Sequence, residues 1–258
     1  MIATPRTPTL LLAAALLAGC AAGARAQSGV RRPPTRAPAG GGVTAAQQAP
    51  DEETLAAERE CAEGESHAAA GRDAEALAAF GRGLKLYFSV YEKGRPPAPV
   101  EGSGAAQAAA AFREATGARL RRAPECVEGY LRVARGVTAF EREQMDALRG
   151  QALMLRETDE SRAVFLMAEV DERARINYKP EPGFTEEARR NHVRGTVRVR
   201  AVLGSDGVVR HVLVLRGLPH GLSEEGVKAA RRMRFTPAVR NGRPVSQFVM
   251  LEYGFETF

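Results

Sequence analysis

The sequence is poor in several residue types that mark particular classes of protein. Among its 258 residues there is no tryptophan, there are only three cysteines and four histidines, and aromatic residues make up 6%. The apolar run Leu10–Leu17 is eight residues long, under half of the roughly 20 residues that a membrane-spanning helix requires. With 44% hydrophobic and 26% charged residues, the chain is neither a disordered tail nor a bundle of membrane helices.

The residues of an enzyme or of a metal site are not found together. Gly102-Ser103-Gly104 has the composition of a loop, and no Gly-Lys-Ser phosphate-binding sequence follows it. Asp206 precedes a glycine and is expected to form a turn rather than to act as a catalytic carboxylate. Neither an H-E-x-x-H motif nor a pair at i,i+4 is present among the histidines, which are His67, His192, His211 and His220. We therefore expect a protein without enzymatic activity, catalytic residues, metal or cofactor.

The N-terminus has the form of a secretory signal. Arg6 precedes the short apolar run, and the run ends in a Leu-Ala-Gly-Cys sequence at Cys20. This sequence resembles the bacterial lipobox, whose cysteine becomes the lipidated first residue of the mature chain. An A-x-A site at 24–26 is an alternative, and cleavage there would release an unlipidated protein that begins at Gln27. We expect a signal peptide over 1–26, lipidation at Cys20, and a membrane-anchored lipoprotein on the periplasmic side of the cell envelope.

Once the signal is removed, the folded part retains Cys61 and Cys126. In an oxidising compartment these two thiols can pair in a disulfide, or they can remain buried as small apolar side chains. Residues 27–50 contain prolines, glycines and almost no large apolar residue, which indicates a flexible tether.

The charge changes sign along the chain. Residues 51–174 hold 23 acidic and 17 basic residues, whereas residues 183–258 hold 7 acidic and 13 basic residues. This asymmetry predicts two units, a helical domain over 51–176 and a second domain over 179–258. Tyr178-Lys179-Pro180-Glu181-Pro182 separates them, since it cannot continue a helix. The basic balance of the second unit could suit nucleic acid, but a secreted chain without interleaved aromatic residues is not expected to bind it.

The first unit is rich in helix-forming residues. We expect helices over 55–70 and 73–87, joined at Gly71, and further helices over 105–116, 124–135, 140–156 and 159–174. Within the first pair, the spacing of Gly64, Gly71, Ala76 and Phe80 resembles one tetratricopeptide repeat. In the helix over 140–156 an apolar stripe faces the core, and it consists of Met145, Leu148, Ala152 and Leu155.

In the second unit the spacing of apolar residues changes from a helical to a mostly alternating pattern. A helix over 185–192 is followed by an alternating strand over 196–203, a turn at 205–207 and a strand over 208–216. A helix over 222–233, a tight turn at Asn241-Gly242 and a strand over 246–255 complete it. The predicted fold class is α+β, with a three-stranded antiparallel sheet covered by two helices on one side. Arg198 and Arg200 are expected on the uncovered, solvated face, and Val249, Leu251, Tyr253 and Phe255 on the buried one.

Several short sequences in the second unit occur in the same order as in one known domain. They are Pro182, Ala188, Gly195-Thr196-Val197-Arg198-Val199, Asp206-Gly207, Gly221-Leu222, Phe235-Thr236-Pro237-Ala238 and Asn241-Gly242-Arg243-Pro244-Val245. Residues 179–258 thereby resemble the C-terminal domain of the TonB energy-transducer family. The resemblance implies a periplasmic, non-enzymatic domain that recognises an extended segment, the TonB box, of outer-membrane transporters. Such recognition is strand addition to an exposed sheet edge, for which we predict Ser246, Gln247, Phe248, Val249, Met250, Leu251, Glu252 and Tyr253.

Two other functions remain open from the sequence. In one, the protein is a lipid-anchored envelope scaffold: the helical region recruits a partner and the last strand forms a homodimer. In the other, the apolar stripe of the helical region is itself a peptide groove.

Overall fold

The structure is a computed structural model, and it describes residues 51–93 and 104–256. The signal peptide, Cys20 and the tether predicted over 27–50 lie outside the described residues. The described residues cluster as one compact unit, and within it the helices and the sheet share a hydrophobic core. The α+β class agrees with the prediction.

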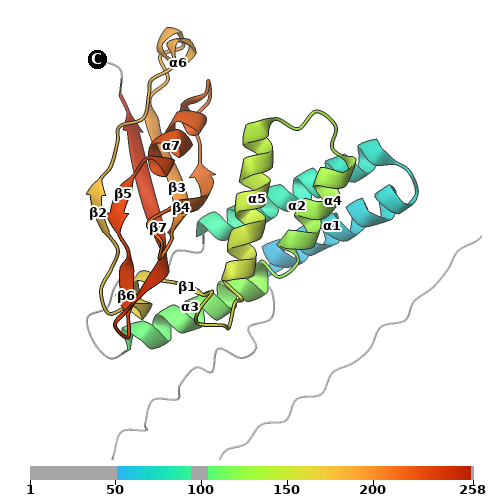
Figure 1. Cartoon of the computed structure of the whole chain (residues 1–258). Coiled ribbons are helices and arrows are strands. Elements are labelled where there is room, and N and C mark those ends of the chain that lie inside the picture. Colours follow the sequence, from blue (N-terminus) through green and yellow to red (C-terminus); the bar gives the residue numbers. More distant parts are fainter. Residues whose placement is uncertain (1–50, 94–103, 257–258) are drawn as a thin grey trace, which may run out of the picture. The chain divides into compact units, whose positions relative to one another are not determined.

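The described part of the chain starts with the predicted pair of antiparallel helices, α1 (Glu52–Ala69) and α2 (Asp73–Lys93) (Figure 1). Asp51 caps α1, because its carboxylate accepts a hydrogen bond from the Thr54 N–H at 2.8 Å. Gly71 joins the two helices with φ +70°, a left-handed conformation that suits glycine. The resemblance of this pair to a tetratricopeptide repeat stays a prediction.

Three further helices complete the helical region: α3 (Ala105–Arg119), α4 (Ala123–Val133) and α5 (Ala139–Met154). The ring of Phe80 packs between α1 and α4 at two glycines. A Cβ atom on Gly64 or Gly129 would lie 2.7 or 2.4 Å from that ring, so both positions require glycine. A disulfide joins Cys61 of α1 to Cys126 of α4.

The helix expected over 159–174 was a wrong prediction. That segment holds the short strand β1 (Val164–Phe165) and the 3₁₀ turn η1 (Met167–Glu169), and strand β2 (Arg175–Tyr178) follows. Contacts with distant parts of the chain explain the difference. Arg113 of α3 binds the Val164 carbonyl oxygen and forms an ion pair with Glu169 at 2.6 Å, while β1 pairs in parallel with the last strand. The helical region therefore ends at Met154, short of the predicted residue 176.

The rest of the chain forms the sheet. Its elements are α6 (Glu186–Arg190), β3 (Gly195–Leu203), β4 (Val209–Arg216), α7 (Leu222–Arg231), β5 (Arg234–Thr236), β6 (Ala238–Arg240) and β7 (Arg243–Phe255). The main sheet has the order β1-β7-β3-β4, with β6 also paired to β7, and β2 pairs with β5 in a separate ribbon. The antiparallel β4-β3-β7 core agrees with the prediction, whereas the three-stranded count was wrong because short segments add to it.

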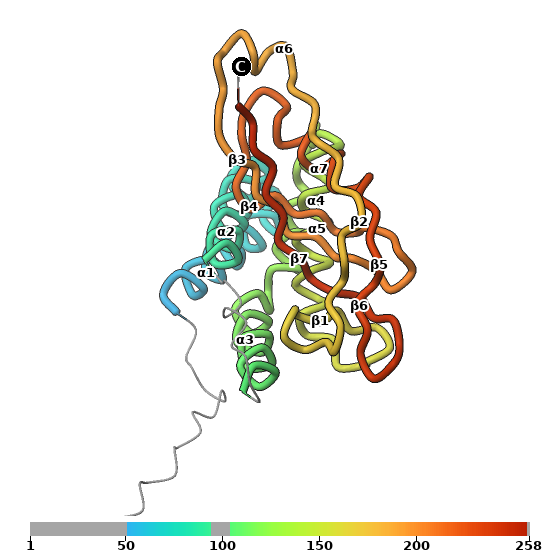
Figure 2. The backbone as a smooth tube through the Cα atoms, turned by 90° about the vertical axis from the view of Figure 1, so that its left-hand side faces the viewer, coloured from blue at the N-terminus to red at the C-terminus, as the bar shows by residue number. Residues whose placement is uncertain are grey.

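Helices cover both faces of the sheet, not one face as predicted. Val197, Val199 and Ala201 pack with α7, together with Leu251 and Tyr253 of β7. The opposite face packs against the helical region, where Val202, Leu213 and Phe248 join its core. Figure 2 shows α2 and α7 on opposite sides of β7.

Burial of this second face overturns the prediction for Arg200. The side chain is 2% exposed instead of solvated. Its guanidinium carbon lies 4.8 Å from the Tyr91 ring centroid and 4.5 Å from that of Phe248.

Candidate functional site

The last strand, β7, has one side that is only partly paired. On its inner side it pairs with β3 without a break, from Gly195 opposite Phe255 to Leu203 opposite Gln247. On its outer side β1 pairs with Ser246 and Gln247. From Phe248 to Phe255, no strand within the described ranges pairs with this outer side.

Two side-chain contacts show which backbone groups face outward. Lys179 Nζ donates a hydrogen bond to the carbonyl oxygen of Glu252 at 2.6 Å, from the outer side. On the far side of β3, Gln151 Nε2 donates to the Arg200 carbonyl oxygen at 3.0 Å. The backbone groups of successive residues point alternately to the two edges of a strand. Glu252 lies opposite Arg198, so when the groups of Glu252 point away from β3, those of Arg198 and Arg200 point away from β7. The two contacts therefore agree. The outward N–H and C=O groups therefore belong to Phe248, Met250, Glu252 and Gly254.

A cavity of about 870 Å³ lies beside the C-terminal half of this edge. One wall is the segment Lys179–Phe184 and another is Glu252–Glu256. Phe184 and Phe255 meet edge to face, with ring centroids 5.9 Å apart. The cavity thus offers both apolar rings and charged groups next to unpaired backbone.

The side chains of β7 differ between its two faces. Tyr253 is 3% exposed and faces α7, and burial raises the pKa of its phenol to about 12. On the other face, Met250 is 40% exposed and Glu252 forms an ion pair with Arg198 at 2.8 Å. Phe248 lies on this same face and is buried under the helical region, so a strand added here would meet exposed side chains of β7 only at Met250 and Glu252.

The opposite edge of the sheet is closed by a side chain of α5. Gln144 Nε2 donates to the Val212 carbonyl oxygen, and Gln144 Oε1 accepts from the Val214 N–H. Gln151 instead bonds within the sheet: it donates to the carbonyl oxygens of Arg200 on β3 and His211 on β4, where the pairing of these two strands shifts register. The edge of β4 is therefore not open to a guest strand at these positions.

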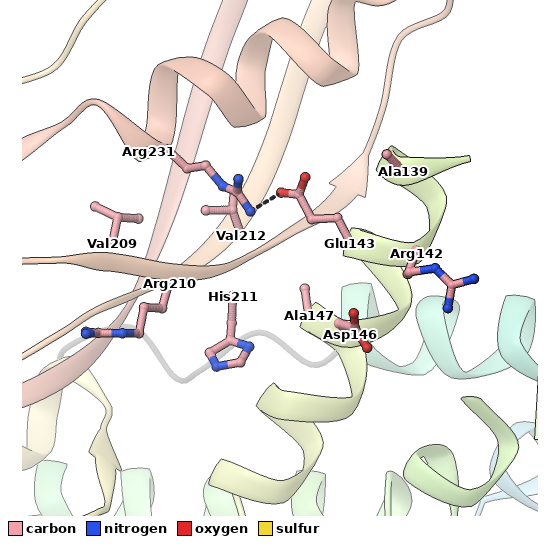
Figure 3. A pocket seen from close by; sticks show the side chains of 10 residues that line it. All are labelled: Ala139, Arg142, Glu143, Asp146, Ala147, Val209, Arg210, His211, Val212 and Arg231. Carbon is pink, nitrogen blue, oxygen red and sulfur yellow. Dashed lines mark ion pairs between the residues drawn. The ribbon is translucent and has the colours of Figure 1, made fainter. Parts of the chain in front are cut away.

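A second cavity, of about 690 Å³, lies between α5, β4 and the end of α7 (Figure 3). Arg231 and Glu143 point toward one another across it and form an ion pair at 2.7 Å. His211 has φ +47°, and burial, followed by the charge of Arg210, lowers its pKa. The lining contains no serine, threonine or cysteine, so it presents no hydroxyl or thiol nucleophile.

The described residues contain neither a cluster of metal ligands nor a membrane-spanning helix. No group of three or more His, Cys, Asp or Glu side chains there could hold a metal ion. None of the helices in residues 51–93 and 104–256 has the length and apolar character needed to cross a membrane.

Comparison with known proteins bears on the sheet region. A family model described as "Gram-negative bacterial TonB protein C-terminal" matches residues 180–257. This region is TonB-like. A solution NMR structure of the Pseudomonas aeruginosa TonB C-terminal domain is 24% identical and covers 34% of this chain and 92% of that chain, with a TM-score of 0.28. No curated protein matches the chain.

Most of the predicted peptide edge lies together on β7 of the TonB-like region. Phe248 to Tyr253 follow one another along the partly unpaired edge, with Phe248 buried beneath the helical region. Ser246 and Gln247 are a correction: β1 already occupies their outer side, because the segment after α5 folds back onto β7.

The sequence patterns did not predict that Lys179, Gln144 and Gln151 take part in this arrangement. Lys179 was noted only as part of a helix-breaking segment. The two glutamines are seven residues apart beside the apolar stripe of α5. Polar residues at that spacing on a buried helix face were the available signal for hydrogen bonds to the backbone of the sheet.

Proposed function

We propose that this chain is a TonB-like protein of the cell envelope that captures an extended peptide by strand addition to the outer edge of β7. The observation that supports it is the row of outward backbone groups from Phe248 to Gly254, beside a cavity, in a region that matches the TonB C-terminal family model. Unpaired N–H and C=O groups on an edge strand are a template for another extended backbone.

The geometry sets the size of the guest. β1 pairs with Ser246 and Gln247, and in this parallel register Phe165 also accepts the outward Phe248 N–H, so the free groups begin at the Phe248 carbonyl. A guest that reaches Gly254 covers about 20 Å at a rise of roughly 3.3 Å per residue. Its backbone supplies the affinity and its alternate side chains the selectivity.

The partner in this proposal is the TonB box of an outer-membrane transporter. Lipidation at Cys20 and a periplasmic location complete the proposal, and intact-mass analysis of the mature N-terminus tests that part separately.

A pair of variants at one position tests the edge. Met250→Pro removes an outward N–H that β3 does not use, in the setting where a strand tolerates proline. Met250→Ala keeps the N–H and removes the side chain. The mature chain is titrated with a fluorescent TonB-box peptide, and circular dichroism checks that each variant is folded.

We expect Met250→Pro to lose peptide binding and Met250→Ala to keep most of it. Peptides N-methylated at successive residues should lose affinity at alternate positions, because only alternate guest N–H groups face β7. A folded Met250→Pro protein with undiminished affinity would exclude this edge. Sedimentation of the peptide-free protein shows whether two β7 edges pair instead, as the scaffold alternative requires.

A further inference from the structure

Lys179 is an ammonium group held in a defined place at the proposed edge. Its Nζ donates to the Glu252 carbonyl oxygen at 2.6 Å and lies 4.7 Å from the centroid of the Tyr253 ring. The backbone on both sides is anchored, since β2 pairs with β5 before it and the buried Pro180 follows it. The charge therefore projects into the cavity of about 870 Å³ from a fixed position.

This ammonium has no carboxylate partner among the described residues. The carboxylate of Glu252 is engaged by Arg198 at 2.8 Å, on the other face of the sheet. Glu181 and Glu256 line the same cavity, yet neither forms an ion pair with Lys179. Arg189, the other basic residue of the lining, binds Glu186 at 3.1 Å. Lys179 is thus the basic group of this cavity without a counter-charge in the described part of the chain.

A guest strand would compete with Lys179 for one atom. Any strand added to β7 places an N–H opposite the Glu252 carbonyl oxygen, the acceptor that Lys179 now uses. The displaced ammonium keeps its contact with the Tyr253 ring, because a cation is attracted to an aromatic face. The N–H donors of the displaced Lys179 ammonium are then available on the α7 side of the sheet, which is the side that Tyr253 faces.

We infer that Lys179 selects guest strands that carry an acidic side chain directly across from Tyr253. This inference rests on the proposed function. Residues opposite one another on paired strands point to the same face, so a guest carboxylate at this one position reaches the ammonium. The neighbouring guest positions point to the other face, toward the Arg198–Glu252 pair. A carboxylate and an ammonium form a charge-assisted hydrogen bond, stronger than one between neutral groups.

The size of the effect follows from exposure. Lys179 is exposed, and an exposed ion pair contributes modestly, so we expect a preference of about 2- to 5-fold for the acidic guest at low salt. The preference should decrease as salt screens the pair.

The experiment uses matched guest peptides and variants of the two basic residues that line the cavity. Peptides that cover Phe248–Gly254 carry one glutamate at successive positions, and each has a twin with glutamine there. They are titrated into the mature wild-type chain, into Lys179→Met, which keeps an apolar stem without charge, and into Arg189→Met as the control from the same cavity. Thermal melting checks the fold of both variants.

We expect the wild type and Arg189→Met to prefer glutamate over glutamine at one position, and Lys179→Met to show no preference. If the wild type bound the glutamate and the glutamine peptide of every pair with equal affinity, the role of Lys179 would be overturned while strand addition remained intact. A preference that survives Lys179→Met would overturn it as well. If no peptide of the set binds, the proposed function itself fails, and this inference fails with it.

Discussion

Gln144 completes the edge of β4 with its side-chain amide, taking the place of a neighbouring strand. Its Nε2 donates to the Val212 carbonyl oxygen at 3.2 Å and its Oε1 accepts from the Val214 N–H at 2.7 Å. A strand that pairs with β4 would use the same two groups. The contact links α5 to the sheet and leaves the outer side of β7 as the edge on which the proposed peptide capture depends.

Removing this amide should destabilise the protein. Gln144→Ala leaves the Val212 carbonyl and the Val214 N–H without partners in a buried position, and we expect a loss of about 1–3 kcal/mol in the free energy of unfolding. Urea denaturation measures it. Arg142→Ala, an exposed position on the same helix, is the control, and its change should stay within about 0.5 kcal/mol. Equal stability of Gln144→Ala and the wild type would show that water or another group replaces the amide.

The buried charge of Arg200 gives a second prediction. Its Nη1 and Nη2 atoms have no hydrogen-bond partner within the described residues, so the charge is stabilised chiefly by the two rings beside it. Arg200→Met keeps much of the volume and removes the charge, and we expect stability to be unchanged or to rise by up to about 2 kcal/mol. Arg200→Ala should lose about 2–4 kcal/mol, because it leaves a cavity. A methionine variant as unstable as the alanine variant would contradict this account.

Acidic pH should weaken the contact of α5 with β4 through His211. Burial lowers the pKa of its imidazole below the ordinary 6.5, so the unfolded chain binds the proton more tightly than the folded protein. Stability is therefore highest when His211 is neutral, and it falls as the pH drops below about 6.5 toward the lower folded-state pKa. Arg210 opposes protonation, whereas Asp146 favours it.

The measurement compares unfolding in urea at neutral and mildly acidic pH. His211→Asn suits the position, because asparagine tolerates the positive φ of +47°. The variant should lose less stability than the wild type over this pH range. The same loss in both proteins would assign the pH dependence to other groups.

Reduction of the disulfide should cost several kcal/mol. Cys61 and Cys126 are separated by 65 positions, and the chain-entropy model assigns about 4 kcal/mol to a loop of that length. Thermal unfolding with and without reductant measures the difference, with the double variant Cys61→Ala and Cys126→Ala as the comparison. No change in melting temperature on complete reduction would contradict the prediction.

Local patterns account for the parts of the fold that were predicted. The alternation of Val197, Val199 and Ala201 requires a strand with one buried face, and that face is the one against α7. Gly207 and the Asn241-Gly242 pair have positive φ, which their residue types favour in tight turns. These features depend on neighbours within a few residues, so they are readable from the chain.

The candidate site was only partly predictable. The edge from Phe248 to Tyr253 was expected from the family resemblance, but the occupation of Ser246 and Gln247 by β1 was not. Residues 163–167 are a continuous apolar run with no helical or strand period, so the run itself does not distinguish between the two structures. Its pairing depends on β7, which is about 80 residues further along the chain.

The sequence by itself determined helices α1 to α5 and α7, strands β3, β4 and β7, the turns, and the apolar face of the last strand, because each depends on short-range period and on residue type. Only the tertiary structure decided that both faces of the sheet are covered, that Gln144 closes one edge, and that Lys179 lies against the other. Those contacts join residues that are about 70 positions apart, and no local pattern specifies which distant backbone group a glutamine or a lysine will meet.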